Sequence, residues 1–177
     1  MSKNRGNEYR YQILRSEARK AAQALAHSNE NLKARGIDTT QIRFDSITPV
    51  EIEASDLWGD EATLYPWYDV HHWKQDDTRG FDLSLWFGQE LCGLCYATPR
   101  KSKICIKIVI LEGKPDKSHP LRGAVAALAL TAIENYALMI GCTEIEVQEP
   151  AAGAIPVYES LGFAFDPTDR LVISIEQ

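Results

Sequence analysis

The residues with the clearest capacity for chemistry lie in the stretch HPLRGAVAALAL, from His119 to Leu130. The first turn of a helix presents unpaired backbone N–H groups and a partial positive charge, and both favour phosphate. From Gly123 to Ala126 the side chains are short enough for phosphate oxygens to approach the main chain, and the Arg122 guanidinium adds a fork of donors. The pattern predicts an anion site here. Small residues also permit close packing of a helix on a sheet, and the residues alone leave that alternative open.

A long helix is predicted to position this site. From Leu121 to Ile140 nearly every residue is apolar, and the polar residues Thr131, Glu134 and Asn135 share one stripe. Gly141 is typical of a helix end. A helix with so wide an apolar face is expected to lie on a sheet.

The remaining elements predict that sheet. We expect an N-terminal helix over Glu8–Arg35, ended by Gly36, short helices and loops over Ala54–Asp77, and a short helix over Ala151–Leu161. Alternating or continuous apolar runs predict strands over Gln41–Glu53 (broken near Pro49), Phe81–Phe87, Leu91–Ala97, Lys103–Leu111, Thr143–Gln148 and Leu171–Ile175. The predicted fold class is α/β, with a mixed, largely antiparallel central sheet flanked by helices. A basic amphipathic helix over residues 1–36 is added to a domain over residues 37–177.

Three motifs in this order resemble the GCN5-related N-acetyltransferase (GNAT) superfamily. They are the helix start HPLRGAVAALAL, the helix end and next strand ALMIGCTEIEV, and the segment AIPVYESLGF with its tyrosine and Gly-Phe exit. The motifs lie between Ile104 and Phe163, and the order of strands extends the resemblance over most of Gln41–Gln177. The resemblance implies a GNAT-like fold and transfer of an acyl group, acetyl being the expected one, from acyl-coenzyme A to a primary amine by direct attack.

The resemblance also assigns roles to particular residues. Acetyl-CoA, as the co-substrate, is expected to lie against one set of residues from the central strand and the loop before the long helix: Ile110, Leu111, Arg122, Gly123, Ala124 and Ala126. Tyr158 stands where the family has a tyrosine near the thioester sulfur. A phenol has a pKa of about 10 and is protonated at neutral pH, so it suits protonation of a leaving thiolate. The alternative for Tyr158 is a core aromatic residue packed with Leu161 and Phe163.

A base for the acceptor amine is harder to identify. Some members of the family use a glutamate on the strand before the phosphate loop, but the interior of KICIKIVILEG has no acidic residue. Glu112 at the end of that strand and Glu149 after the next one are the candidates that we carry forward, and either can also be a solvated surface group. Positioning of the two reactants can contribute to catalysis without a dedicated base.

A second function remains open. Leu121, Ala124 and Ala151 depart from the residues that the family usually has at the matching positions. These departures favour an alternative in which a degenerate GNAT-like domain acts as a non-catalytic binding or assembly module.

No metal site is predicted. Cys92 and Cys95 have the spacing of a zinc knuckle, but Cys105 and Cys142 form no second pair. Because residues three apart on a strand point to opposite faces, we expect buried thiols at Cys92 and Cys95. The adjacent His71 and His72 lack a partner cluster.

Composition limits the class of protein and its partners. The 177 residues are 45% hydrophobic, and no apolar run is long enough for a signal peptide or a membrane span, so we expect a cytoplasmic protein without a membrane partner. The net charge is −6, although residues 1–36 carry eight basic and three acidic residues. The acidic remainder makes nucleic acid an unlikely partner and suits a cationic or amine-bearing acceptor, such as a polyamine, a lysine side chain or an aminoglycoside. The first helix is expected to pack on its own chain or on a second copy in a homodimer.

Overall fold

The computed structural model describes residues 2–59, 65–102, 104–116 and 118–176. Its centre is a seven-stranded sheet in the order β1-β2-β3-β4-β5-β7-β6, in which β4 and β5 are parallel and the other neighbours are antiparallel. The strands are β1 (Ile42–Asp45), β2 (Phe81–Phe87), β3 (Glu90–Pro99), β4 (Cys105–Gly113), β5 (Glu144–Val147), β6 (Ala164–Phe165) and β7 (Leu171–Ser174). The prediction of a mixed, largely antiparallel α/β sheet is confirmed.

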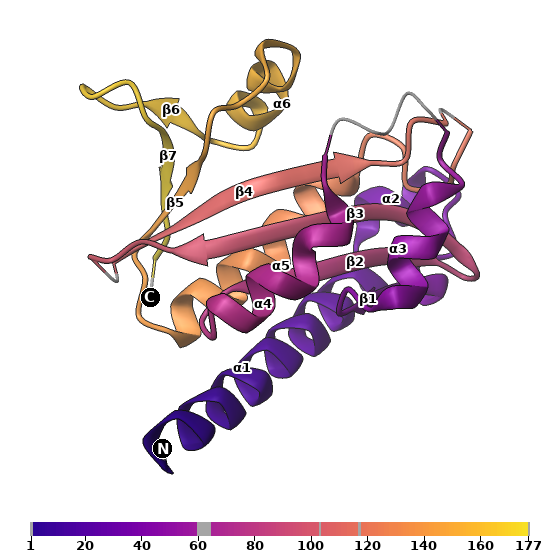
Figure 1. Cartoon of the computed structure of the whole chain (residues 1–177). Coiled ribbons are helices and arrows are strands. Elements are labelled where there is room, and N and C mark those ends of the chain that lie inside the picture. The colour runs from indigo at the N-terminus through magenta and orange to yellow at the C-terminus, as the bar shows by residue number, and fades with distance from the viewer. Residues whose placement is uncertain (1, 60–64, 103, 117, 177) are drawn as a thin grey trace.

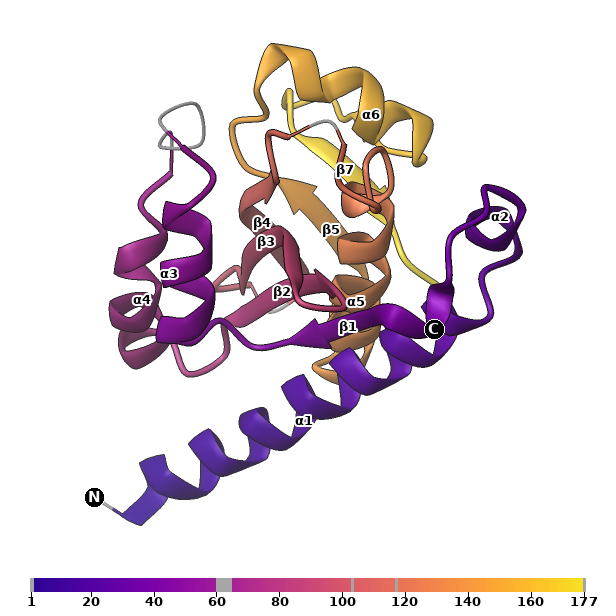
Figure 2. The same ribbon diagram turned by 90° about the vertical axis from the view of Figure 1, so that its right-hand side faces the viewer.

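Helices cover both faces of the sheet (Figures 1 and 2). The long helices α1 and α5 lie on one face, α3 and α4 lie on the other, and α6 lies beyond β5 next to β6 and β7. The helices are α1 (Ser2–His27), α2 (Glu30–Ala34), α3 (Pro49–Asp56), α4 (Val70–Asp76), α5 (Val125–Met139) and α6 (Ile155–Ser160), with 3₁₀ turns η1 (Thr39–Gln41), η3 (Trp67–Asp69) and η4 (Ala152–Ala154). No helix within the described ranges is long and apolar enough to cross a membrane.

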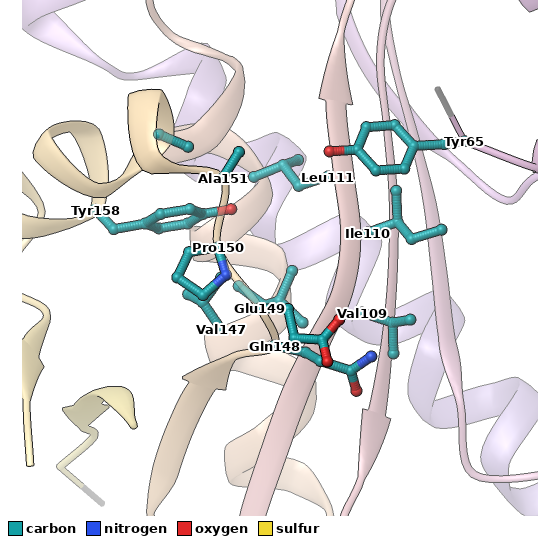
Figure 3. Close-up of a pocket in the computed structure, with 12 residues that line it drawn as sticks. Tyr65, Val109, Ile110, Leu111, Val147, Gln148, Glu149, Pro150, Ala151 and Tyr158 are labelled. Atoms are coloured by element: carbon teal, nitrogen blue, oxygen red, sulfur yellow. The ribbon is translucent and has the colours of Figure 1, made fainter. Parts of the chain in front are cut away.

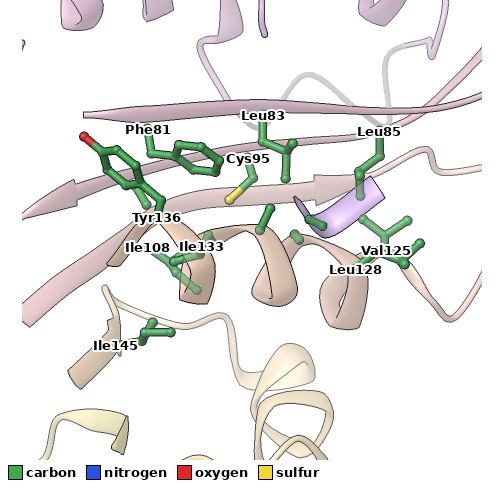
Figure 4. Close-up of a cluster of buried hydrophobic side chains, with 14 of the residues drawn as sticks. Phe81, Leu83, Leu85, Cys95, Ile108, Val125, Leu128, Ile133, Tyr136 and Ile145 are labelled. Carbon is green, nitrogen blue, oxygen red and sulfur yellow. The ribbon is translucent and has the colours of Figure 1, made fainter. Parts of the chain in front are cut away.

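The larger core lies between the sheet and α5 (Figure 4). Leu83 and Cys95 point from the strands toward α5, and the rings of Phe81 and Tyr136 stack with centroids 4.8 Å apart. Cys92 belongs to the same cluster as Cys95, so the expectation that these thiols face opposite sides is wrong. The reason is an irregularity in the pairing of β2 with β3, which shifts the alternation next to Cys92.

Helix α1 is part of this core. Ala18 and Ala22 are fully buried and let α1 approach α5 and β1 closely. The Arg19 guanidinium reaches the Asp82 carboxylate of β2 at 2.8 Å. The predicted single helix over Glu8–Arg35 is divided, because Asn29 caps a new helix by accepting a hydrogen bond from the Leu32 N–H at 3.0 Å.

A smaller aromatic core covers the opposite face. Trp58 and Trp67 pack there with Trp86, Leu94 and Ile110 of the sheet. The covering helix α3 replaces the second half of the predicted strand over Gln41–Glu53, which is therefore wrong beyond Asp45. Thr48, Pro49 and Glu51 explain the change: Thr48 and Glu51 form a capping box, and Pro49 takes the first helical turn.

Candidate active site

Strands β4 and β5 part in the middle of the sheet. Their parallel pairing ends at Ile108 and Val147, followed by one hydrogen bond from the Gln148 N–H to the Ile108 carbonyl at 2.9 Å. In contrast, β4 stays paired with β3 as far as Gly113. Val109 is the extra residue of a β-bulge in β4, because Tyr96 and Ala97 of β3 pair with Ile110 and Ile108. The bulge and the divergence leave one edge of β4 without a strand partner among the residues that the structure describes.

A cavity of about 160 Å³ opens at this point (Figure 3). Its walls are the β4 residues Val109, Ile110 and Leu111, the segment that follows β5, and α6. Ile110 and Leu111, which were predicted to bind the coenzyme, therefore lie in the wall. Their role in binding stays a prediction.

Tyr158 projects from α6 into the cavity, and its hydroxyl points toward Tyr65 on the other side of β4 (Figure 3). The ring is 7% exposed and meets Phe163 edge-on with centroids 5.4 Å apart. Burial, with smaller effects from Cys95 and Tyr65, raises the pKa of Tyr158 above its usual value, so the phenol stays protonated at neutral pH. Tyr158 thus combines core packing with a hydroxyl at the cavity, and its role as an acid stays a prediction.

A second cavity, of about 270 Å³, lies at the start of α5. Arg122, Gly123 and Ala126 line it, together with His119 and Lys114. Burial lowers the pKa of His119, and its Nδ1 atom is buried without a hydrogen-bond partner in the described part of the chain. No role was predicted for the His119 side chain from the sequence.

The helix starts later than predicted. Leu121 to Gly123 form a turn that precedes α5, and Ala124 is the residue before the first helical turn. Gly123 has a φ of 78°, a left-handed conformation that glycine adopts without strain. Ala124 is buried and has no capping side chain within the described residues, so the first N–H groups of α5 remain available to an anion.

The two candidate carboxyl groups differ in their surroundings. Glu149, which has a φ of 42°, is exposed at the rim of the cavity beside β4 and β5. Glu112 lies within β4, which extends two residues beyond the predicted end, and it is half-buried against the aromatic core. Burial raises the pKa of Glu112 to about 7, opposed by a hydrogen bond from the Trp67 indole. A carboxyl group with a pKa near neutrality suits proton transfer.

The cysteine and histidine residues considered as metal ligands differ in exposure: the cysteines are buried, and His71 and His72 are exposed. All four cysteines are buried, and none forms a disulfide within the described residues. The rings of His71 and His72 lie 3.8 Å apart, centroid to centroid, on the outer side of α4. No group of three or more potential metal ligands occurs among the residues that the structure describes.

Tyr65, which lines the cavity, was not predicted from the sequence, and Trp67, for which a core role was favoured over an acceptor pocket, lies in the aromatic core. They lie in the segment over Ala54–Asp77, whose geometry the sequence did not predict, and part of that segment, residues 60–64, lies outside the described residues. The concentration of tryptophan in this segment is the signal for a functional site that the sequence offers, but a cluster of aromatic residues belongs more often to a hydrophobic core than to a functional site.

Comparisons with known proteins support the fold. No family model matches the chain, and no curated protein matches its sequence. Among solved structures, Ard1 from Thermoplasma volcanium matches with a TM-score of 0.61 and 10% identity, over 78% of this chain and 100% of that one. The ribosomal-protein-S18-alanine N-acetyltransferase from Escherichia coli matches with a TM-score of 0.56 and 16% identity, over 77% of this chain and 95% of that one. The structure of yncA from Salmonella typhimurium with its cofactor acetyl-CoA matches with a TM-score of 0.55 and 10% identity, over 78% of this chain and 96% of that one.

At these identities the likeness establishes the architecture, including the parallel pair β4 and β5 within a mostly antiparallel sheet. This chain therefore has the fold of the GCN5-related N-acetyltransferases, as its sequence motifs predicted.

Proposed function

We propose that this chain transfers an acyl group, acetyl being the expected one, from coenzyme A to a primary amine of a small molecule or a protein. The observation that carries the proposal is the cavity between the parting strands β4 and β5, with the Tyr158 hydroxyl directed into it. The amine attacks the thioester carbonyl directly, so the C–N bond forms as the C–S bond breaks.

The free edge of β4 is the feature that suits the coenzyme. From Val109 to Leu111 the strand has no partner on the side of β5 within the described residues, and an extended amide-bearing ligand can add to such an edge as a further strand does. The first N–H groups of α5, with Gly123, Ala126 and the Arg122 guanidinium, are suited to the pyrophosphate. Bound coenzyme supplies the activated acyl group.

Two proton transfers accompany the reaction. Glu112 lies outside the lining of this cavity, and we assign it the proton that the amine loses because its carboxyl has no cationic partner in the described residues and its pKa is raised to about 7. Tyr158 donates to the departing thiolate, since its hydroxyl is protonated at neutral pH. Glu149, at the exposed rim, can attract a cationic acceptor.

The acceptor is proposed to be a cation or an amine-bearing molecule. Support comes from the net charge of −6, which attracts cations, and from the E. coli structure of the same fold, whose name specifies acetylation of an alanine of a ribosomal protein.

A screen tests the proposal. The full chain is mixed with acetyl-CoA and a panel of primary amines, namely polyamines, lysine peptides, peptides with free N-termini and aminoglycosides, and the release of free thiol is followed. The alcohol analogue of each active amine is the control. Amine-dependent thiol release with an acetylated product supports the function, whereas binding of coenzyme without turnover on any amine favours the non-catalytic alternative.

A further inference from the structure

The carboxyl group of Glu112 has an unusual partner. Within the described residues it forms one hydrogen bond, which its Oε1 accepts from the Trp67 indole N–H at an Nε1–Oε1 distance of 3.2 Å. An indole donates one hydrogen bond and accepts none, so in this contact one oxygen of the Glu112 carboxyl group, Oε1, is the acceptor. Oε2 has no partner among these residues.

Other carboxyl groups buried in the sheet are held differently. Asp82 is paired with Arg19 at 2.8 Å and Lys74 at 3.1 Å. Glu146 is paired with Arg100 at 2.5 Å. These cations lower the pKa of both carboxyl groups, and each group stays ionised at neutral pH. Glu112 differs because its partner is a neutral donor.

The Trp67 side chain is itself held firmly. It is 4% exposed and packs in the aromatic core with Val70, Leu94 and Ile110. Its backbone N–H donates to the carbonyl of Tyr65, a residue of the cavity wall, at 3.0 Å. The indole therefore has a fixed direction, and it ties the carboxyl group of β4 to the segment that bears Tyr65.

We propose that Trp67 is a positioning residue, whose indole N–H holds Oε1 of Glu112 so that Oε2 is left to take the proton of the acceptor amine. The inference rests on the proposed function for the identity of that proton. Trp67 lies on the segment before α4, 45 residues before Glu112 in the sequence.

The titratable groups near Glu112 bind other residues or lie on other surfaces. Lys114 binds Glu90 at 2.7 Å, and the Tyr96 hydroxyl bonds to Asp77 at 3.5 Å. The Tyr65 phenol is directed into the cavity (Figure 3). Cys95 lies on the face of β3 that meets α5, away from the aromatic core. Among the described residues, burial and the indole are therefore the influences that set the ionisation of Glu112.

Nuclear magnetic resonance of the full chain tests the contact without an acceptor. The indole ¹H–¹⁵N signal of Trp67 is expected to shift across the neutral range with a midpoint near pH 7, because it reports the ionisation of Glu112. In Glu112→Gln the same signal is expected to stay constant. A Trp67 signal that does not respond to pH in the wild-type protein overturns the proposal, and this measurement needs no tryptophan variant that folds.

Substitution tests the consequence. In Trp67→Phe the ¹³C carboxyl signal of Glu112 is expected to titrate about one pH unit higher, since a hydrogen bond to the charged form is lost. The matched control is Trp58→Phe, which removes an indole from the same aromatic core and is expected to leave the midpoint unchanged. Equal midpoints in Trp67→Phe and wild type contradict the proposal.

Kinetics separates this inference from the function on which it rests. With an active amine, the acidic limb of kcat/KM is expected to move to higher pH in Trp67→Phe and to disappear in Glu112→Gln. Loss of turnover in Glu112→Gln with an unmoved limb in Trp67→Phe refutes the role of Trp67 and leaves the function intact. An indole signal coupled to Glu112 in a chain that acetylates no amine refutes the function and leaves the contact intact.

Discussion

Ile108 of β4 and Val147 of β5 form the last parallel pair between their strands, and the cavity begins directly beyond them. The bulge at Val109 falls at the same place. The fold thus creates an unpaired edge in the middle of a sheet, where burial of a backbone without a partner is costly. An extended ligand with its own amide groups relieves that cost, and this is why we propose that the coenzyme binds there.

Tyr158→Phe is expected to lower turnover at least ten-fold while leaving the affinity for acetyl-CoA nearly unchanged. The ring and its packing against Phe163 are kept, and only the hydroxyl directed into the cavity is lost. Thiol release and calorimetry measure the two quantities. Tyr68→Phe is the control, because Tyr68 is 67% exposed. Equal turnover in Tyr158→Phe and the wild-type protein removes the hydroxyl from the mechanism.

Gly123→Glu is expected to abolish coenzyme binding, because it sets a negative charge at the cavity proposed for the pyrophosphate. A Cβ at Gly123 meets no atom within 4 Å, although its φ of 78° makes most side chains strained there. Gly123→Asn is the matched control, since asparagine tolerates this conformation and carries no charge. We expect calorimetry to show that Gly123→Glu does not bind the coenzyme and that Gly123→Asn does. Normal binding by a folded Gly123→Glu protein places the pyrophosphate elsewhere.

The rate is expected to fall as the pH drops below about 7, because Glu112 must be ionised to take a proton and its pKa is raised to about 7. Glu112→Gln is expected to lower kcat/KM on the order of 100-fold at pH 8 and to remove this dependence. Glu149→Gln, at the exposed rim, tests the other carboxyl group. A loss of activity in Glu149→Gln with none in Glu112→Gln reverses the assignment.

Glu112 is also expected to affect stability. Its folded pKa of about 7 lies above the usual value, so the folded state favours the protonated form. This stabilisation is complete at acidic pH, below the pKa of an unfolded glutamate, and is lost as the pH rises toward 7. Because the group is only half-buried, solvent screening reduces the effect to about 1–2 kcal/mol. Urea unfolding should therefore show Glu112→Gln to be more stable than wild type at pH 8. The reverse order at pH 8 contradicts the raised pKa.

The sequence predicted the layers of the fold because their signals are local. Strand β2 has the predicted bounds, and the apolar face of α5 predicted a helix on a sheet. The helix that begins at Pro49, where a strand was predicted, has a signal in the sequence, since Thr48 and Glu51 have the spacing of a capping box. The early start predicted for α5 arose because apolar Leu121 continues the helical pattern into a turn.

The site was less predictable because its geometry depends on pairing between distant segments. Tyr158 and the loop at Gly123 were found through motifs, whereas Trp67 and Glu112 are 45 residues apart and meet only in the folded sheet. The extent of β4 past Leu111 depends on its register with β3. The bulge at Val109 has no glycine or proline to mark it in the sequence.

Calorimetric titration of the purified chain with acetyl-CoA, with adenosine diphosphate as the control ligand, tests the central claim most directly. We predict saturable binding of acetyl-CoA with a Kd in the micromolar range and much weaker binding of the diphosphate, because the pantetheine arm has the free edge of β4 to pair with. The absence of binding at millimolar acetyl-CoA would contradict the claim and favour a domain that keeps the fold for assembly with other proteins.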